Sequence, residues 1–174
     1  MNILEPSSVF NFFFEICKIP RESGNEAGMT RFLENFAKAR NLEYQTDKTG
    51  NVVIRKPASP GKENRPGVIL QSHTDMVCEK NEDTVFDFSK DAIQTYVEDG
   101  WLKAKGTTLG ADDGIGVAAS LAVLDDDSLE HGPLECLFTV SEETGLDGAR
   151  AVAPGFIKGS ILLNLDSEDE GEVF

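Results

Sequence analysis

The segment GVILQSHTD, residues 67–75, joins an apolar run to a histidine and an aspartate. The apolar run contains β-branched residues and no charge, which is typical of a strand buried on both faces of a sheet. Two later, largely apolar segments are also predicted to be buried strands, LECLFTV at residues 134–140 and SILLNL at residues 160–165. Three such strands in one chain indicate a sheet with a largely parallel core.

Helical patterns lie before and between these strands. We expect helices at residues 7–18, 25–40, 114–124 and 148–152. Ser7 or Ser8 is the expected cap of the first helix. Strands that alternate with helices predict an α/β fold, with a mixed, mostly parallel sheet and helices on both faces.

Short strands and turns account for much of the rest. The expected strands are residues 42–46, 51–55, 94–98 and 101–104, the last two forming a hairpin around Asp99-Gly100. The IPRESGNE segment between the first two helices is interpreted as a polar turn.

The charge of the chain limits its partners. The 16 Lys and Arg residues and the 31 Asp and Glu residues give a net charge of −15 at pH 7. Nucleic acids and anionic membranes both require a basic face, so we expect neither as a partner. The three cysteines are widely spaced and include no C-x-x-C pair, which favours a reducing, cytoplasmic location. The acidic excess instead fits a cleft that holds cations.

Side chains that could bind a metal follow the ends of the predicted strands or begin a helix. They are His73, Asp75, Asp112, Asp113, Glu142, Glu143, Asp166 and Glu168. Because ligands bind outside the carboxyl ends of strands in open α/β sheets, we expect these segments to converge on one cleft. So many carboxylates require cations, and one imidazole among them suits Zn²⁺ or a related divalent ion. Their number favours a pair of ions, about 3.5–4 Å apart.

Each segment also has a simpler interpretation when it is taken alone. A histidine after a strand is often a hydrogen-bonded core residue, a pair of aspartates often caps a helix, and adjacent glutamates often form a solvated loop. His131 is interpreted as a surface residue, and Asp125–Asp127 as a solvated loop or a weak Ca²⁺ site. An unrelated acidic α/β binding module for Ca²⁺ is therefore an alternative.

Four motifs in order, SHTDMV, LGADDGIG, SEETG and NLDSED, resemble the co-catalytic zinc peptidases of the aminoacylase/carboxypeptidase/dipeptidase group. The resemblance covers nearly the whole chain. Gly114 directly after the aspartate pair is typical of the branch that acts on aminoacyl-histidine (Xaa-His) dipeptides, since many relatives have lysine there. The resemblance implies hydrolysis of a dipeptide substrate by a zinc-activated water.

The resemblance also implies roles for individual residues. The implied metal ligands are His73, Asp112, Glu143 and Asp166, with Asp112 bridging two zinc ions. Asp75 would orient His73, and Glu142 would be the general base that moves a proton from the water to the leaving amine. The peptide bond after Asp112 is expected to be cis. The residues alone do not decide which of the two adjacent glutamates binds the metal and which stays free.

One part of the family pattern is missing from this sequence. The family needs a further histidine ligand from later in its chain, and His131 lies in the wrong motif. A lid or dimerisation insertion and the C-terminal part of the catalytic domain are also missing. Residues 1–174 are therefore interpreted as the N-terminal part of a zinc-peptidase catalytic domain, and we expect this chain to be inactive or nearly so. A homodimer is implied for a full-length protein, and a catalytically dead metal-binding or interaction domain is the alternative.

Overall fold

The computed structural model describes residues 4–167, so Glu168 lies outside the described residues. Its helices are α1 (Ser7–Ile16), α2 (Ala27–Ala39), α3 (Ala111–Asp125) and α4 (Asp147–Ala151). Its main sheet is formed by β1 (Glu43–Thr46), β2 (Val52–Lys56), β3 (Val68–His73), β6 (Leu134–Thr139) and β7 (Ile161–Asn164). A separate hairpin is formed by β4 (Thr95–Glu98) and β5 (Trp101–Ala104). Every expected element is present, with ends displaced by a few residues.

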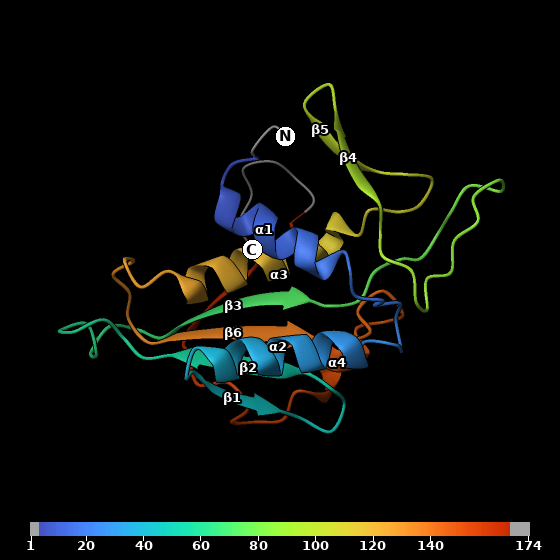
Figure 1. Cartoon of the computed structure of the whole chain (residues 1–174). Coiled ribbons are helices and arrows are strands. Elements are labelled where there is room, and N and C mark those ends of the chain that lie inside the picture. The colour runs from blue at the N-terminus through green and yellow to red at the C-terminus, as the bar shows by residue number, and fades with distance from the viewer. Residues whose placement is uncertain (1–3, 168–174) are drawn as a thin grey trace.

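The main sheet is mixed, as expected, and its strand order is β1-β2-β6-β3-β7. Strands β6, β3 and β7 are parallel neighbours, whereas β2 is antiparallel to both β1 and β6. In the main sheet, β2 therefore runs antiparallel to the other four strands. His73 pairs in register with Thr139 at the end of β6, and Gln71 pairs with Asn164 at the end of β7. The loops after these three strands therefore leave the sheet at the same end, which Figure 1 shows for β3 and β6.

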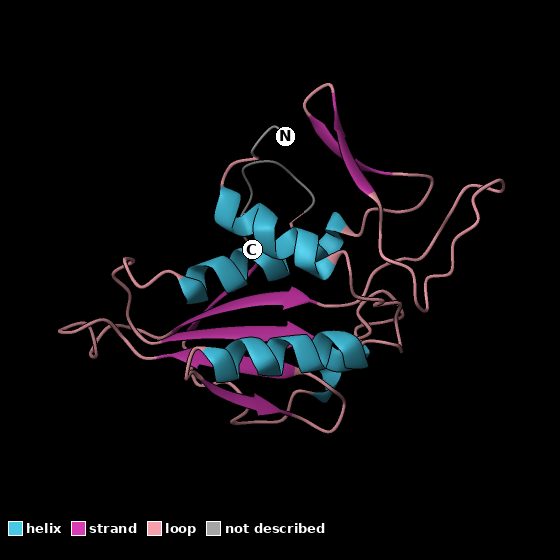
Figure 2. Cartoon of the chain, viewed as in Figure 1, coloured by secondary structure: helices cyan, strands magenta, loops and turns pink. Residues whose placement is uncertain are grey.

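The alternation of strand side chains divides the core between the two faces of the sheet. Val52 and Ile54 belong to a large cluster that includes the apolar sides of α1, α2 and α3. Val53, between them in sequence, belongs to a smaller cluster with Leu137 and Phe156. Val152, at the end of α4, packs against this second cluster. Helices therefore serve both faces, but the three longer ones cover one face only (Figure 2).

Two helix starts differ from the sequence-based expectation. Neither Ser7 nor Ser8 caps α1; Pro6 occupies the cap position without a side-chain hydrogen bond, and the Ser7 N–H donates to Glu5 Oε2 at 2.9 Å. Helix α3 begins earlier than expected, at Ala111, with non-helical backbone angles at Asp112 and Asp113. The periodicity of apolar residues did not predict this first turn, because Asp112 and Asp113 do not continue the apolar stripe of the helix.

The hairpin projects from the body of the molecule, as Figure 1 shows. Asp99 and Gly100 both have positive φ angles, 52° and 81°, as the expected two-residue turn requires. Among residues 4–167 no helix combines the length and the apolar character needed to cross a membrane.

Candidate metal centre

His73 ends β3 and is almost fully buried, with 1% of its surface exposed. Its Nδ1 lies 3.2 Å from Asp75 Oδ1, and its Nε2 lies 2.8 Å from Asp112 Oδ1. Burial by itself lowers the pKa of His73, but the neighbouring carboxylates of Asp75, Asp113 and Asp112 outweigh it and raise the pKa to about 9. The imidazole is therefore held in a fixed orientation among carboxylates.

Three side chains among the described residues meet at one point. His73 Nε2 lies 2.8 Å from Asp112 Oδ1 and 3.8 Å from Asp166 Oδ2, and the three ligand atoms all lie within 4.8 Å of one another. His73 is buried, whereas the Asp112 side chain is 65% exposed. An ion at this point would be enclosed on the histidine side and open to solvent on the Asp112 side, as a catalytic metal requires.

The carboxylates at this point repel one another. Burial raises the pKa of Asp166, and the charges of Asp112 and Glu142 raise it further against the opposing effect of His73. A bound cation would remove this repulsion. Clustering, donor type and electrostatics thus all fit a metal.

Asp75 is the most connected carboxylate of the centre and is completely buried. Besides His73, it accepts hydrogen bonds from Ser23 Oγ at 2.6 Å and from the N–H groups of Glu142 at 3.0 Å and Glu143 at 3.2 Å. Burial by itself raises the pKa of Asp75, but the hydrogen bonds outweigh it and lower the pKa to about 2. Asp75 is therefore ionised at neutral pH.

The turn before α3 carries Asp112 and Asp113. The Asp112–Asp113 peptide bond is cis, as expected, and Gly110 precedes the pair with a φ of 67°. The two side chains diverge: Asp112 faces His73 Nε2, whereas buried Asp113 accepts the N–H groups of His73 and Gly116, each at 3.1 Å. Burial raises the pKa of Asp113 to about 7. Asp113 thus joins the end of β3 to the start of α3.

The turn after β6 carries the two adjacent glutamates. Ser141 has a φ of 49°, and its N–H and hydroxyl both donate to Glu26 Oε1 at 2.8 Å. Glu143 lies outside the three-residue ligand group that the described residues form. Burial raises the pKa of Glu143, and the charges of Asp112 and Asp75 raise it further. The turn is therefore next to the ligand group, although its side chains do not complete it.

The segment between α1 and α2 contributes residues that the sequence did not single out. Arg21 and Glu26 are buried, with exposed fractions of 2% and 6%, and Ser23 contacts Asp75. The interpretation of IPRESGNE as a polar turn was therefore incomplete. Polar residues between two helices usually face solvent, so no local pattern distinguishes this turn from an ordinary one.

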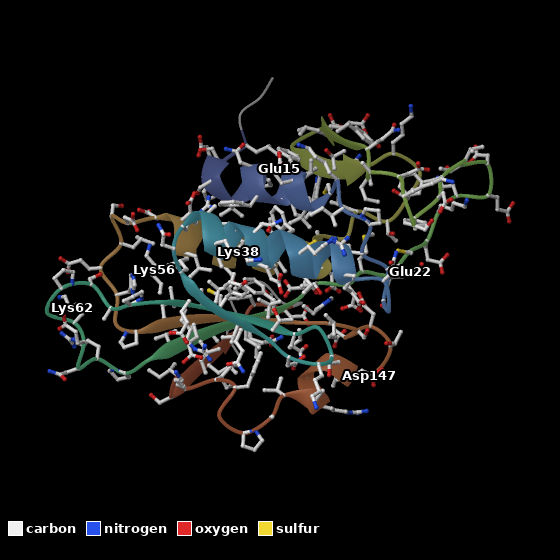
Figure 3. The ribbon with its side chains drawn as sticks, turned by 60° about the horizontal axis from the view of Figure 1, so that its bottom comes forward. Glu15, Glu22, Lys38, Lys56, Lys62 and Asp147 are labelled. Atoms are coloured by element: carbon white, nitrogen blue, oxygen red, sulfur yellow. The ribbon has the colours of Figure 1, made fainter. Side chains whose placement is uncertain are left out.

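The remaining candidates are not part of the centre. His131 is half-buried rather than fully on the surface, and its backbone N–H donates to Ser59 Oγ. It lies in the loop before β6, whereas the candidate metal centre lies beyond the other end of β6. The three consecutive aspartates have separate partners: Asp125 pairs with Arg40, Asp127 pairs with Lys56, and Asp126 accepts from Ser128. Figure 3 shows Lys56 and Lys62 at one end of the molecule and Glu22 and Asp147 at the other.

Comparison with known proteins gives a consistent result. Residues 69–169 match the model of the peptidase family M20/M25/M40. The chain is 48% identical to the cytosol non-specific dipeptidase of Escherichia coli, over 98% of the chain and 35% of that protein. Two solved structures are also similar, and the chain covers only part of each.

The first is an aminoacylhistidine dipeptidase from Vibrio alginolyticus, with a TM-score of 0.94 and 50% identity over 97% of this chain and 34% of that one. The second is a tripeptidase from Staphylococcus aureus, with a TM-score of 0.78 and 26% identity over 95% of this chain and 44% of that one. The chain thus spans about a third of the length of its more similar relatives.

Proposed function

The chain belongs to the peptidase family M20/M25/M40, and from this membership we propose that its residues serve the hydrolysis of dipeptides, with Xaa-His dipeptides as the preferred substrates. The family is metal-dependent, and its relatives named above are peptidases. The observation that carries the proposal is the convergence of His73, Asp112 and Asp166 within 4.8 Å of one another. The Escherichia coli and Vibrio alginolyticus relatives are both named as dipeptidases, which supports a dipeptide substrate.

The proposed metal is zinc, with two ions in the complete site. An imidazole and two carboxylates suit Zn²⁺ better than Ca²⁺ or Mg²⁺, although related divalent ions share this preference. His73 and Asp166 would hold one ion. Asp112 would bridge to a second, for which its exposed side chain leaves room, and Glu143 would bind that second ion.

The surrounding residues would prepare the centre and move protons. Asp75 lies 3.2 Å from His73 Nδ1 and would hold the ring proton there, so that a metal replacing the proton on Nε2 would bind at that nitrogen. When bound, the metal supplies an acidified water and a polarised scissile carbonyl. The backbone N–H of Glu142 donates to Asp75. The Glu142 carboxylate would accept a proton from the attacking water and deliver it to the leaving amine.

The proposal extends to the whole protein. The partial coverage of the relatives supports residues 1–174 as the first part of a catalytic domain in a longer protein, which would also hold the missing histidine ligand and a dimerisation insertion. The proposed whole protein is a cytoplasmic homodimer that acts on dipeptides. The name of the Escherichia coli relative, a cytosol dipeptidase, supports the cytoplasmic location.

Turnover of an Xaa-His dipeptide tests this function. We expect activity from a longer protein containing these residues and little or none from residues 1–174. In the longer protein, Glu142→Gln should lower kcat by about 10²–10⁴-fold with zinc retained, whereas Glu143→Gln should lower the zinc content. Full activity of Glu142→Gln would contradict the role of the base. A longer protein that binds zinc but hydrolyses no dipeptide would favour the catalytically dead domain.

A further inference from the structure

The loop between α1 and α2 contacts each of the loops that follow β3 and β6 and the turn that precedes α3. Ser23 donates to the Asp75 carboxylate, and Glu26 accepts both hydrogen bonds from Ser141. Arg21 makes the remaining contacts, through its side chain and through its backbone carbonyl, which accepts the Met76 N–H at 3.1 Å. Arg21, Ser23 and Glu26, all within one short loop, therefore form a common support for the candidate metal centre.

The Arg21 guanidinium joins two of these loops directly. Its Nη1 donates to the carbonyl oxygens of Thr74 at 3.2 Å and Asp75 at 2.9 Å, and its Nη2 donates to the carbonyl oxygen of Gly110. The loop after β3 carries the carboxylate that orients His73, and Gly110 lies two residues before Asp112. One planar group with fixed donor directions thus sets the separation of these two segments.

Two glycines next to the Arg21 guanidinium, Gly110 and Gly114, leave space for it. A Cβ atom at Gly114 would lie 2.7 Å from Arg21 Nη2, and a Cβ atom at Gly110 would lie 2.3 Å from it. Gly110 also has a positive φ, which glycine adopts without strain. At Gly114 no such backbone reason exists, because its φ is ordinary. The absence of a side chain at Gly114 therefore leaves room for the Arg21 guanidinium, and also for the Phe13 ring, whose Cε2 would lie 3.1 Å from a Cβ atom there.

The positive charge of Arg21 also lies close to buried acidic side chains. Arg21 is 2% exposed in a chain with a net charge of −15, and the nearby side chains of Asp75 and Asp113 are buried as well. A buried cation needs such partners, and buried carboxylates need a cation. Removing the guanidinium would leave three carbonyl groups without their donor and the buried, ionised Asp75 without a permanent cation nearby.

We propose that Arg21 is a positioning residue for the metal centre, which holds the His73–Asp75 segment and the Asp112 turn at the separation that metal binding needs. The proposal rests on the proposed function for the identity of the ligand, a metal ion, whereas the hydrogen bonds of Arg21 are independent of it. Without Arg21, the two segments would keep their side chains but lose the hydrogen-bond donor that joins them.

Two measurements on the purified chain test this proposal. The first is amide hydrogen exchange of the metal-free protein, compared between the parent, Arg21→Met, Arg21→Lys and the exposed control Arg31→Met. We expect Arg21→Met to accelerate exchange about tenfold at Met76, Glu142 and Glu143 relative to Cys136 in the sheet. Lysine keeps the charge but not the planar fork, so Arg21→Lys should give a smaller acceleration. Equal acceleration at Cys136 would make Arg21 a general structural residue and overturn the proposal.

The second measurement is zinc affinity by competition with a chelator, together with the visible absorption spectrum of bound Co²⁺. We expect Arg21→Met to weaken zinc binding by about 10- to 100-fold and to change the Co²⁺ spectrum, with Arg31→Met unchanged. A folded Arg21→Met with parental affinity and spectrum would overturn the proposal. If Arg21→Met does not fold, Gly114→Ala and Arg21→Lys decide, with an expected loss of about threefold or more in each. Parental affinity in both would overturn the proposal.

The two proposals can fail separately. If the parent chain binds no zinc while exchange at Met76, Glu142 and Glu143 still responds to Arg21→Met, the metal centre has failed as a proposal and the positioning by Arg21 stands. If the parent binds zinc and neither exchange nor affinity responds to Arg21, the positioning has failed and the metal centre stands.

Discussion

The carboxylate of Asp75 accepts the backbone N–H of Glu142 at 3.0 Å, although 67 positions separate the two residues. The same carboxylate is 3.2 Å from His73 Nδ1. One buried group therefore fixes the imidazole and the turn that carries the adjacent glutamates. The proposed metal ligand and the proposed base are positioned relative to each other through Asp75.

Asp75→Asn tests this double role. An asparagine side chain presents an N–H₂ group where one carboxylate oxygen now accepts hydrogen bonds, so it cannot satisfy Ser23, His73 and the two backbone N–H groups together. We expect zinc affinity to fall by about 10- to 100-fold and the free energy of unfolding to fall by about 1–3 kcal/mol. Chelator competition and urea denaturation measure the two effects. The exposed Asp83→Asn is the matched control, and equal losses in both variants would contradict the prediction.

Zinc content separates the two histidines of the chain. His73→Ala removes the imidazole at which three ligand atoms converge, so elemental analysis should find at least one zinc fewer per chain than in the parent. His131→Ala should keep the zinc of the parent, because His131 lies before β6 and at the opposite end of that strand. Equal zinc loss in both variants would indicate adventitious binding to imidazole rather than a formed centre.

The sequence predicted the sheet well because its strands are marked by local patterns. Uncharged or largely apolar runs such as residues 67–72 identify the buried strands, and the Asp99-Gly100 pair identifies the hairpin. The rule that ligands bind beyond the carboxyl ends of strands then brought His73, Asp112 and Asp166 together. The structure confirms this convergence, whereas the roles of the individual residues remain predictions.

Other features of the site depend on contacts between distant positions. Arg21 meets Gly110 across 89 positions and Glu26 meets Ser141 across 115 positions. Neither residue lies on an apolar stripe or in a recognisable motif, so their burial could not be inferred from periodicity. A buried arginine in a short polar turn is revealed only by the tertiary structure.

Metal uptake should release protons. In the metal-free chain the pKa of His73 is raised to about 9, because the surrounding carboxylates outweigh the effect of burial. At pH 7.5 the imidazole therefore carries a proton that a metal at Nε2 must displace. We expect the apparent zinc affinity to fall by about tenfold for each pH unit below 9 through this group. Calorimetry in two buffers with different ionisation enthalpies measures the protons released, and binding without proton release between pH 6 and 8 would refute the expectation.

Gly148→Ala tests the packing of α4 against the end of β6, directly before the glutamate turn. A Cβ atom at this position would lie 2.3 Å from the Val140 carbonyl oxygen and 2.6 Å from Asn51 Oδ1. Neither atom can move freely, since Asn51 is buried and accepts the Val140 N–H at 3.1 Å. We therefore expect the free energy of unfolding in urea to fall by about 1–3 kcal/mol.

The control for this variant is Arg150→Ala, an exposed change in the same short helix, which should stay within about 0.5 kcal/mol of the parent. Because Val140 directly precedes the turn held by Glu26 and Asp75, displacement of its backbone should also weaken zinc binding in the folded fraction of Gly148→Ala. A destabilised variant with parental zinc affinity would show that the two buried carboxylates hold the turn independently of α4. A variant with parental stability would instead show that α4 does not pack closely on β6.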